Sequence, residues 1–229
     1  MIISHRYRFI FIKTMKTAGT SIEVYLSRRC GPEDVFTPIR PAVEGHVARN
    51  HRGFFNPLGE MLGGSRADAI EALRDLRRRR KFYNHLPARV ARHRVGRRVW
   101  NGYFKFCVER NPWDKTLSHF HMLNYRRGEP SSLDDYLAGD DFCLNHPYYM
   151  DPGGERPLVD RVLRYERLLD ELGEIFERLG VPFSGSLEVQ AKSHYRSDRR
   201  PYREVYTDEQ RRAVARTFRK EIQLHGYTY

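Results

Sequence analysis

Three runs in the chain have the length and composition of β-strands: two are apolar, and the third alternates apolar and charged residues. They span residues 7–12, 103–108 and 159–165, and the first two are rich in aromatic and β-branched side chains. Each run is followed by a segment in which apolar residues recur at helical spacing. Because strands alternate with helices along the chain, the pattern predicts an α/β fold with a mainly parallel central sheet flanked by helices.

The helical segments have readable ends. We expect helices over residues 20–29, 65–81, 86–93, 112–125 and 166–179, and a last one from residue 207 to about residue 226. In the second of them, Ser65 with Asp68 has the spacing of a capping box. Ile70, Leu73 and Leu76 share one face of that helix, which predicts the side that packs on the core.

Residues 32–64 are rich in proline and glycine and show neither a helical nor a strand period. We expect a long irregular segment there, and such segments in compact domains often carry function. The chain has no internal repeat and no linker of disordered composition, so we expect a single domain over residues 1–229.

Composition points to an anionic partner. The 229 residues include 41 Lys and Arg against 29 Asp and Glu, a formal net charge of +12. This excess favours nucleotides, phosphorylated or sulfated sugars, nucleic acid or acidic membranes. The cysteines, Cys30, Cys107 and Cys143, are too far apart for a disulfide framework or a zinc ribbon. We find no membrane span and no signal segment, and expect a cytoplasmic protein.

The turn after the first strand has the composition of an anion-binding loop. It reads Lys16-Thr17-Ala18-Gly19-Thr20-Ser21. Gly19 allows close approach to the backbone, the helix amino terminus adds N–H groups, and Lys16 supplies a mobile charge. The loop differs from the GxxxxGK(S/T) motif of nucleoside triphosphatases, because its lysine precedes its glycine. A capped turn with a solvated lysine is the alternative interpretation.

The turn after the second strand also suits an anion. It reads Arg110-Asn111-Pro112-Trp113-Asp114, with Ser118 about two helical turns beyond Arg110. Pro112 favours the first position of a helix, and Arg110 can bind a phosphate through two parallel N–H groups. Alternatively, Arg110 ties loop carbonyls together. Since ligands of such folds bind at the carboxyl ends of the strands, we expect both turns at one site.

Together, these turns resemble the nucleotide-binding motifs of sulfotransferases. The first is similar to their 5′-phosphosulfate loop, and Arg110 to Asp114 with Ser118 is similar to their 3′-phosphate motif. The resemblance is to the carbohydrate-type family and its bacterial members. Softer matches lie at Thr37-Pro38-Ile39, at Tyr83-Asn84-His85, at Tyr165-Glu166, and in the tail from Tyr202-Arg203 to Gly226-Tyr227.

The resemblance implies a P-loop-like three-layer fold and 3′-phosphoadenosine 5′-phosphosulfate (PAPS) as co-substrate. The residues that would hold its 5′ end are Lys16, Thr17, Ala18, Gly19, Thr20 and Ser21, and those for the 3′ phosphate are Arg110 and Ser118. Such enzymes close a loop over the nucleotide in a late basic segment, which here contains Lys192, Arg196, Arg199 and Arg200. A solvated basic loop is the alternative for that segment.

The implied reaction is in-line sulfuryl transfer to an acceptor hydroxyl, expected on a carbohydrate or glycolipid. Lys16 would neutralise the charge on the leaving oxygen, and a general base must take the hydroxyl proton. His85 is our first choice, because related bacterial proteins carry a histidine there. His46, in a Gly-His-Val setting, is the competitor, and a carboxylate such as Glu44 or no single base are further alternatives.

Other functions stay open. A kinase on a related fold lacks support because the GxxxxGK(S/T) motif is missing. A nucleic-acid-binding protein lacks support because the chain has no recognised nucleic-acid-binding motif. A chain that has lost activity and only binds nucleotide is a further possibility.

We expect no metal, since the chain has no HExxH or Cys/His cluster. The basic run 77–81 is a solvated helix end or attracts an anionic glycan. We expect the acceptor pocket within residues 35–100 and 125–155.

Overall fold

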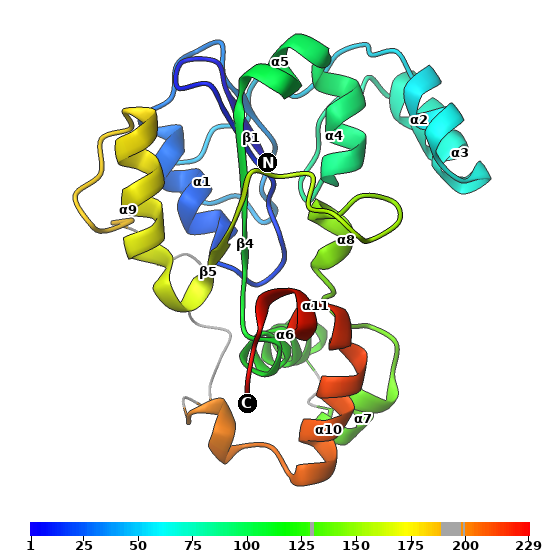
Figure 1. Ribbon diagram of the computed structural model, residues 1–229, viewed down its shortest axis with the longest axis vertical. Helices are drawn as coiled ribbons and strands as arrows, with labels where there is room; N and C mark the ends of the chain where they lie inside the picture. Colours follow the sequence, from blue (N-terminus) through cyan, green and yellow to red (C-terminus); the bar gives the residue numbers. More distant parts are fainter. Residues whose placement is uncertain (129–130, 189–197, 199) are drawn as a thin grey trace.

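A computed structural model describes residues 1–128, 131–188, 198 and 200–229 (Figure 1). Among these residues, one sheet has the strand order β3-β1-β2-β4-β5. Its strands are β1 (Ile2–Ser4), β2 (Phe9–Phe11), β3 (Val35–Phe36), β4 (Phe104–Glu109) and β5 (Arg161–Arg164). The predicted strands are β2, β4 and β5, and they lie side by side.

The sheet is mixed rather than mainly parallel. β2, β4 and β5 pair in parallel, with Phe9 opposite Phe104 and Phe106 opposite Arg161. β1, however, pairs antiparallel with both β2 and β3. The connection from β1 to β2 is only residues 5–8, and so short a link permits only an antiparallel hairpin. β1 has three residues and β3 has two, and such short strands show no period in the sequence.

Helices occupy the predicted segments, with additional short ones between them. The helices are α1 (Gly19–Ser27), α2 (Leu58–Gly63), α3 (Arg66–Arg77), α4 (Ala88–Val95), α5 (Arg97–Gly102), α6 (Pro112–Arg127), α7 (Leu133–Ala138), α8 (His146–Tyr149), α9 (Leu168–Leu179), α10 (Asp208–Thr217) and α11 (Arg219–His225), with 3₁₀ turns η1 (Tyr165–Arg167) and η3 (Tyr202–Glu204). The predicted last helix is divided at Phe218, and α2 lies inside the segment expected to be irregular.

Alternate residues of the strands enter two separate cores. Phe9 and Phe11 pack on one face of the sheet against α1 and α9, whereas Ile10 and Ile12 pack on the other against α4 and α8. Figure 1 shows α1 and α9 on one side of the sheet and α4 and α5 on the other. The result is three layers, with the helices covering both faces as expected.

The predicted core face of α3 is wrong for Ile70 and Leu73, whereas Leu76 is half-buried. Ile70 and Leu73 are 45% and 48% exposed, while Ala72 and Asp75 are buried. The capping box of Ser65 with Asp68 does form, so the helix begins where the sequence indicates. The helix ends at Arg77, four residues before the predicted end, and its rotation about its own axis also differs from the expectation.

A buried arginine explains this rotation. Arg94 of α4 donates from Nε and Nη2 to the two carboxylate oxygens of Glu60, at 2.7 Å each, and from Nη1 to Asp75 at 3.0 Å. All three side chains are almost completely buried. A buried cation needs its paired carboxylates close by, and this requirement turns Asp75 inward and the apolar stripe outward.

We therefore expect Arg94→Met to destabilise the protein by about 3–5 kcal/mol, because two buried carboxylates lose their partner. Urea unfolding at neutral pH measures this difference. Arg92→Met is the matched control on the exposed side of the same helix and should change the free energy of unfolding by about 0.5 kcal/mol or less. Equal stabilities for the two variants would contradict the assignment.

Candidate functional site

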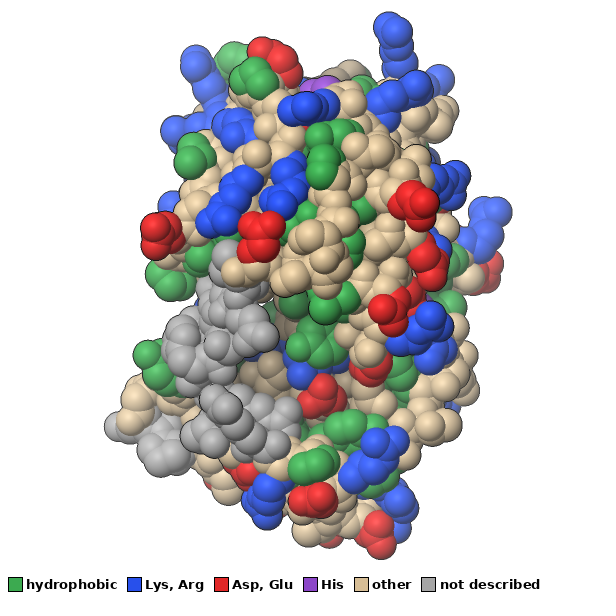
Figure 2. Space-filling view, turned by 90° about the vertical axis from the view of Figure 1, so that its left-hand side faces the viewer, with side chains coloured by type: hydrophobic (Ala, Val, Ile, Leu, Met, Phe, Trp, Pro, Cys, Tyr) green, Lys and Arg blue, Asp and Glu red, His purple; other side chains and the backbone are tan. Residues whose placement is uncertain are grey.

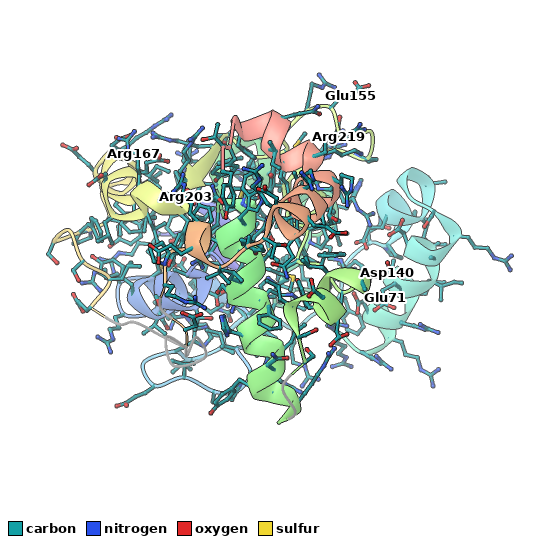
Figure 3. All side chains as sticks on the ribbon, turned by 90° about the horizontal axis from the view of Figure 1, so that it is seen from below. Glu71, Asp140, Glu155, Arg167, Arg203 and Arg219 are labelled. Carbon is teal, nitrogen blue, oxygen red and sulfur yellow. The ribbon has the colours of Figure 1, made fainter. Side chains whose placement is uncertain are left out.

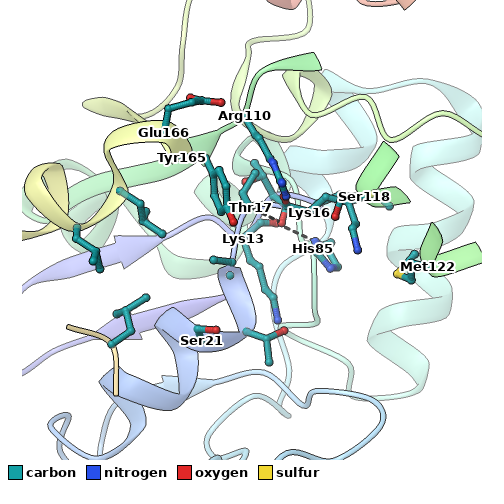
Figure 4. Close-up of a pocket in the computed structure, with 18 of the residues that line it drawn as sticks. Lys13, Lys16, Thr17, Ser21, His85, Arg110, Ser118, Met122, Tyr165 and Glu166 are labelled. Carbon is teal, nitrogen blue, oxygen red and sulfur yellow. Dashed lines mark hydrogen bonds between the residues drawn. The ribbon is translucent and has the colours of Figure 1, made fainter. Parts of the chain in front are cut away.

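A cavity of about 1290 Å³ opens beside the ends of β2 and β4. Figure 4 shows the side chains that line it, and Figure 2 shows the molecule hollowed at mid-height, with basic side chains in the recess. The predicted site residues among its lining are Lys16, Thr17, Ala18, Gly19, Thr20, Ser21, His85, Arg110 and Ser118. The fold thus brings both turns, which are about ninety residues apart, to one cavity.

The first turn wraps tightly before α1 begins. Lys16 and Ala18 both have left-handed backbones, with φ of 60° and 57°. Ala18 is the N-cap residue of α1 and offers no side-chain acceptor to the first helical N–H groups. An anion in the cavity can therefore take the place of a capping side chain.

Gly19 is required by close approach rather than by its backbone angle. A Cβ at this position would lie 2.7 Å from Cγ of Lys13. The Lys13 side chain is buried, and its ammonium donates to Glu23 of α1 at 2.5 Å. Lys13 also lines the cavity and was not among the predicted site residues. Its place directly after an apolar strand is the signal that could have indicated it.

The second turn is built by Asn111 and Arg110. The side chain of Asn111 accepts the N–H groups of Trp113 and Asp114 and so caps α6. Arg110 donates from Nε and Nη2 to Asp114, at 2.9 and 2.7 Å, and its guanidinium lies 4.1 Å from the ring centre of Tyr165. These contacts fix the orientation of the guanidinium.

Arg110 also joins the two turns. Its Nη1 donates to the Lys16 carbonyl at 3.0 Å, so the loop-tying interpretation is true of this structure. The described residues take three of the five guanidinium N–H groups, which leaves one hydrogen on each Nη atom. Arg110 therefore lines the cavity with donor capacity for an anion.

Asn145 connects the first turn to the end of β4. Its side chain accepts the Met15 N–H at 2.8 Å, donates to the Met15 carbonyl at 3.0 Å and donates to Glu109 at 3.1 Å. The sequence gives no local sign of this role, because Asn145 lies far along the chain from both partners.

Glu109 belongs to a buried charge cluster, which also contains Lys115 and Glu221. The Lys115 ammonium lies 2.7 Å from Glu109 and 3.3 Å from Glu221. Burial, partly offset by Lys115, raises the pKa of Glu109. Burial also disfavours the charged form of Glu221, but Lys115 and hydrogen bonds from residues 145 and 146 outweigh it and lower the pKa of Glu221.

His85 presents a proton-accepting nitrogen at the cavity. Its Nδ1 lies 3.0 Å from the Lys13 carbonyl, the contact dashed in Figure 4. A carbonyl only accepts, so Nδ1 carries the hydrogen and Nε2 keeps its lone pair. Burial and the charge of Lys13 lower the pKa of His85 to about 3. The imidazole is therefore neutral at pH 7.

Two other predicted site residues, His46 and Arg200, are not among the residues that line the cavity. His46 does not line the cavity; it packs edge-on against Phe36, and its Nε2 is buried without a hydrogen-bond partner among the described residues. Burial lowers the pKa of His46. Arg200 pairs with Asp198 on the surface. The predicted residues Lys192, Arg196 and Arg199 lie outside the described part of the chain.

Two further features bear on the class of site. Within the described residues, no group of three or more His, Cys, Asp or Glu side chains is placed to hold a metal ion. In the same part of the chain, every helix is too short or too polar to cross a bilayer.

Comparison with known proteins gives few relatives. No protein-family model matches the chain. An uncharacterised protein of Archaeoglobus fulgidus is 33% identical over 103 residues, which cover 42% of this chain and 84% of that protein.

Two solved structures to which the chain is similar are sulfotransferases. Mouse sulfotransferase SULT7A1 complexed with PAP has a TM-score of 0.46 and 18% identity, over 96% of this chain and 86% of that chain. A sulfotransferase from Alicyclobacillus acidocaldarius has a TM-score of 0.42 and 18% identity, over 96% of both chains.

The packing of Gly19 on Lys13 leads to a test. Gly19→Ala should destabilise the protein by about 1–3 kcal/mol, because the new methyl group overlaps the buried lysine stem. Gly63→Ala is the matched control, since a Cβ at Gly63 meets no atom within 4 Å. Urea unfolding compares the variants, and an unchanged stability in Gly19→Ala would contradict the close approach.

Proposed function

We propose that this chain transfers a sulfuryl group from PAPS to an acceptor hydroxyl, of a carbohydrate or glycolipid. One observation carries the proposal: the two turns that resemble the 5′-phosphosulfate and 3′-phosphate motifs line the same cavity. Neither turn alone distinguishes a nucleotide from any other anion. Two anion sites in one cavity suit a nucleotide that is phosphorylated at both ends.

In the proposed complex the first turn holds the phosphosulfate. The N–H groups at the start of α1 and the hydroxyls of Thr20 and Ser21 are donors of the kind that an anion requires. Lys16 neutralises the charge that develops on the bridging oxygen as the S–O bond breaks. Arg110 and Ser118 bind the 3′ phosphate from the other turn.

His85 is the proposed general base. The acceptor oxygen attacks sulfur, the bond from sulfur to the phosphate oxygen breaks, and the hydroxyl proton passes to Nε2 of His85. A pKa near 3 keeps this nitrogen unprotonated before the reaction. The negative charge of the bound donor raises the proton affinity of His85 when the proton must be taken up.

Ligand-induced stabilisation tests which nucleotide the protein binds. At about 100 times its dissociation constant, 3′-phosphoadenosine 5′-phosphate should add roughly 2.7 kcal/mol, a rise in Tm of about 5–10 °C. ATP and GTP at the same concentration should give little shift. Stabilisation by ATP without any effect of the bisphosphate would reject the proposal in favour of a kinase-like protein.

In the same experiment, Arg110→Ala tests the proposed contact between Arg110 and the 3′ phosphate. The variant should weaken bisphosphate binding by about 10-fold or more, because a charge-assisted contact is lost. Arg92→Ala removes the same charge from the exposed face of α4, away from the cavity lining, and should bind as the unmodified protein does. Equal affinities of the two variants would remove Arg110 from the site.

Turnover tests the base. His85→Ala should lower kcat by about 100-fold or more while bisphosphate binding survives. His46→Ala should keep its activity, because His46 does not line the cavity. Release of the bisphosphate from PAPS, with an acceptor taken from a panel of glycans and glycolipids, provides the measurement. Full activity of His85→Ala and loss in His46→Ala would reverse the assignment.

A further inference from the structure

The helical hairpin formed by α2 and α3 is charged on its inner side. Glu60 of α2 and Asp75 of α3 pair with the buried Arg94, and Asp68 of α3 pairs with Arg89 at 2.7 Å. Both helices lie at the edge of the molecule in Figures 1 and 3. Ion pairs therefore hold the hairpin to the body, together with the small buried side chain of Ala72.

Several of its large apolar side chains are exposed to solvent. Leu58 and Leu62 of α2 are 56% and 86% exposed, and four residues apart they share one face. Ile70 and Leu73 of α3 form a second exposed pair at a spacing of three. Phe54, in the loop before α2, is 66% exposed. These five make up more than half of the large exposed hydrophobic residues in the described part of the chain.

Arginines surround these apolar residues. Arg66 and Arg77 continue the exposed stripe of α3 at helical spacing, on either side of Ile70 and Leu73. The exposed arginines of this region are Arg66, Arg74, Arg77, Arg78 and Arg79. Glu60 and Asp75 are buried with Arg94, and Asp68 pairs with Arg89. The remaining acidic side chain of α3, Glu71, is half-buried and lies 3.6 Å from Arg74. The outward surface is apolar and strongly basic.

We propose that this hairpin, Phe54 to Arg79, docks the protein on the surface of an anionic lipid bilayer. The protruding leucine and isoleucine side chains enter the boundary between headgroups and acyl chains, and the arginines bind lipid phosphates. α3 has 12 residues, which suits a helix that lies in the interface rather than one that crosses it. The proposal does not depend on the reaction proposed above.

A lipid surface fits better than a protein partner. A second copy of this chain would bring the two arginine groups together across a two-fold axis, and like charges repel. A folded acidic partner needs a surface of complementary shape, whereas Leu62 projects almost wholly into solvent at the end of a short helix. A fluid bilayer accommodates such separate projecting side chains.

Vesicle co-sedimentation tests the proposal with the full chain. The protein should bind vesicles of about 70% phosphatidylcholine and about 30% phosphatidylglycerol, and the binding should weaken as the salt concentration rises. It should not bind vesicles of pure phosphatidylcholine, so that it stays in the supernatant when these vesicles are pelleted. The combined variant Arg77→Gln, Arg78→Gln, Arg79→Gln should lower the partition coefficient by about 100-fold. Leu62→Ser with Ile70→Ser and Leu73→Ser should lower it by about tenfold or more.

Matched controls separate the hairpin from net charge and general hydrophobicity. Arg212→Gln, Arg216→Gln, Arg219→Gln removes three exposed charges from α10 and α11, and Leu224→Ser removes an apolar side chain that is 40% exposed. Both should bind vesicles as the unmodified protein does. Thermal unfolding of the hairpin variants should be unchanged, because the altered side chains are exposed.

Several outcomes would overturn the proposal. They are absence of binding to the anionic vesicles, binding that survives both hairpin variants, and equal losses in hairpin and control variants. A dimer seen by analytical ultracentrifugation that the hairpin variants dissociate, without vesicle binding, would assign the surface to a second copy instead.

Discussion

The site depends on the buried group of Glu109, Lys115 and Glu221. Three charges removed from water cost several kcal/mol each, and only close pairing with further hydrogen bonds offsets that cost. Lys115 meets both carboxylates, while Asn145 and the Tyr149 hydroxyl bind Glu109. Because these groups come from β4, α6, α8 with the residue before it, and α11, the arrangement that satisfies them also fixes the ends of the sheet around the cavity.

The need to pair a buried charge also shapes the hairpin of α2 and α3 at the edge of the molecule. Arg94 determines which side of α3 is buried, against the helix's own apolar stripe. Ordinarily an apolar stripe faces the core, since burying Ile70 and Leu73 would be favourable by about 1.5–3 kcal/mol each. An unpaired buried guanidinium costs more than that, so the ion pairs decide. The outcome is an exposed apolar surface, which gives the hairpin its proposed role.

Two cationic side chains at the cavity, Lys13 and Arg110, have different roles. Lys13 is buried and paired with Glu23, so its contribution is positional: its stem supports Gly19 and its carbonyl fixes the tautomer of His85. Arg110 is oriented by Asp114 and keeps donors for an anion. A neutral imidazole beside fixed positive charge suits a site that receives an anion and then accepts a proton.

The sequence by itself determined the parts that are local. The three parallel strands, the beginning of α3 at Ser65 and the composition of both anion turns follow from periodicity, capping and turn chemistry, which act within a few residues. Tertiary structure decided the antiparallel strands β1 and β3, the outward face of α3, and the bridge that Asn145 makes to Met15 over 130 residues. The physical reason is that buried ion pairs and hydrogen bonds join distant segments, and a single buried charge outweighs a local hydrophobic pattern.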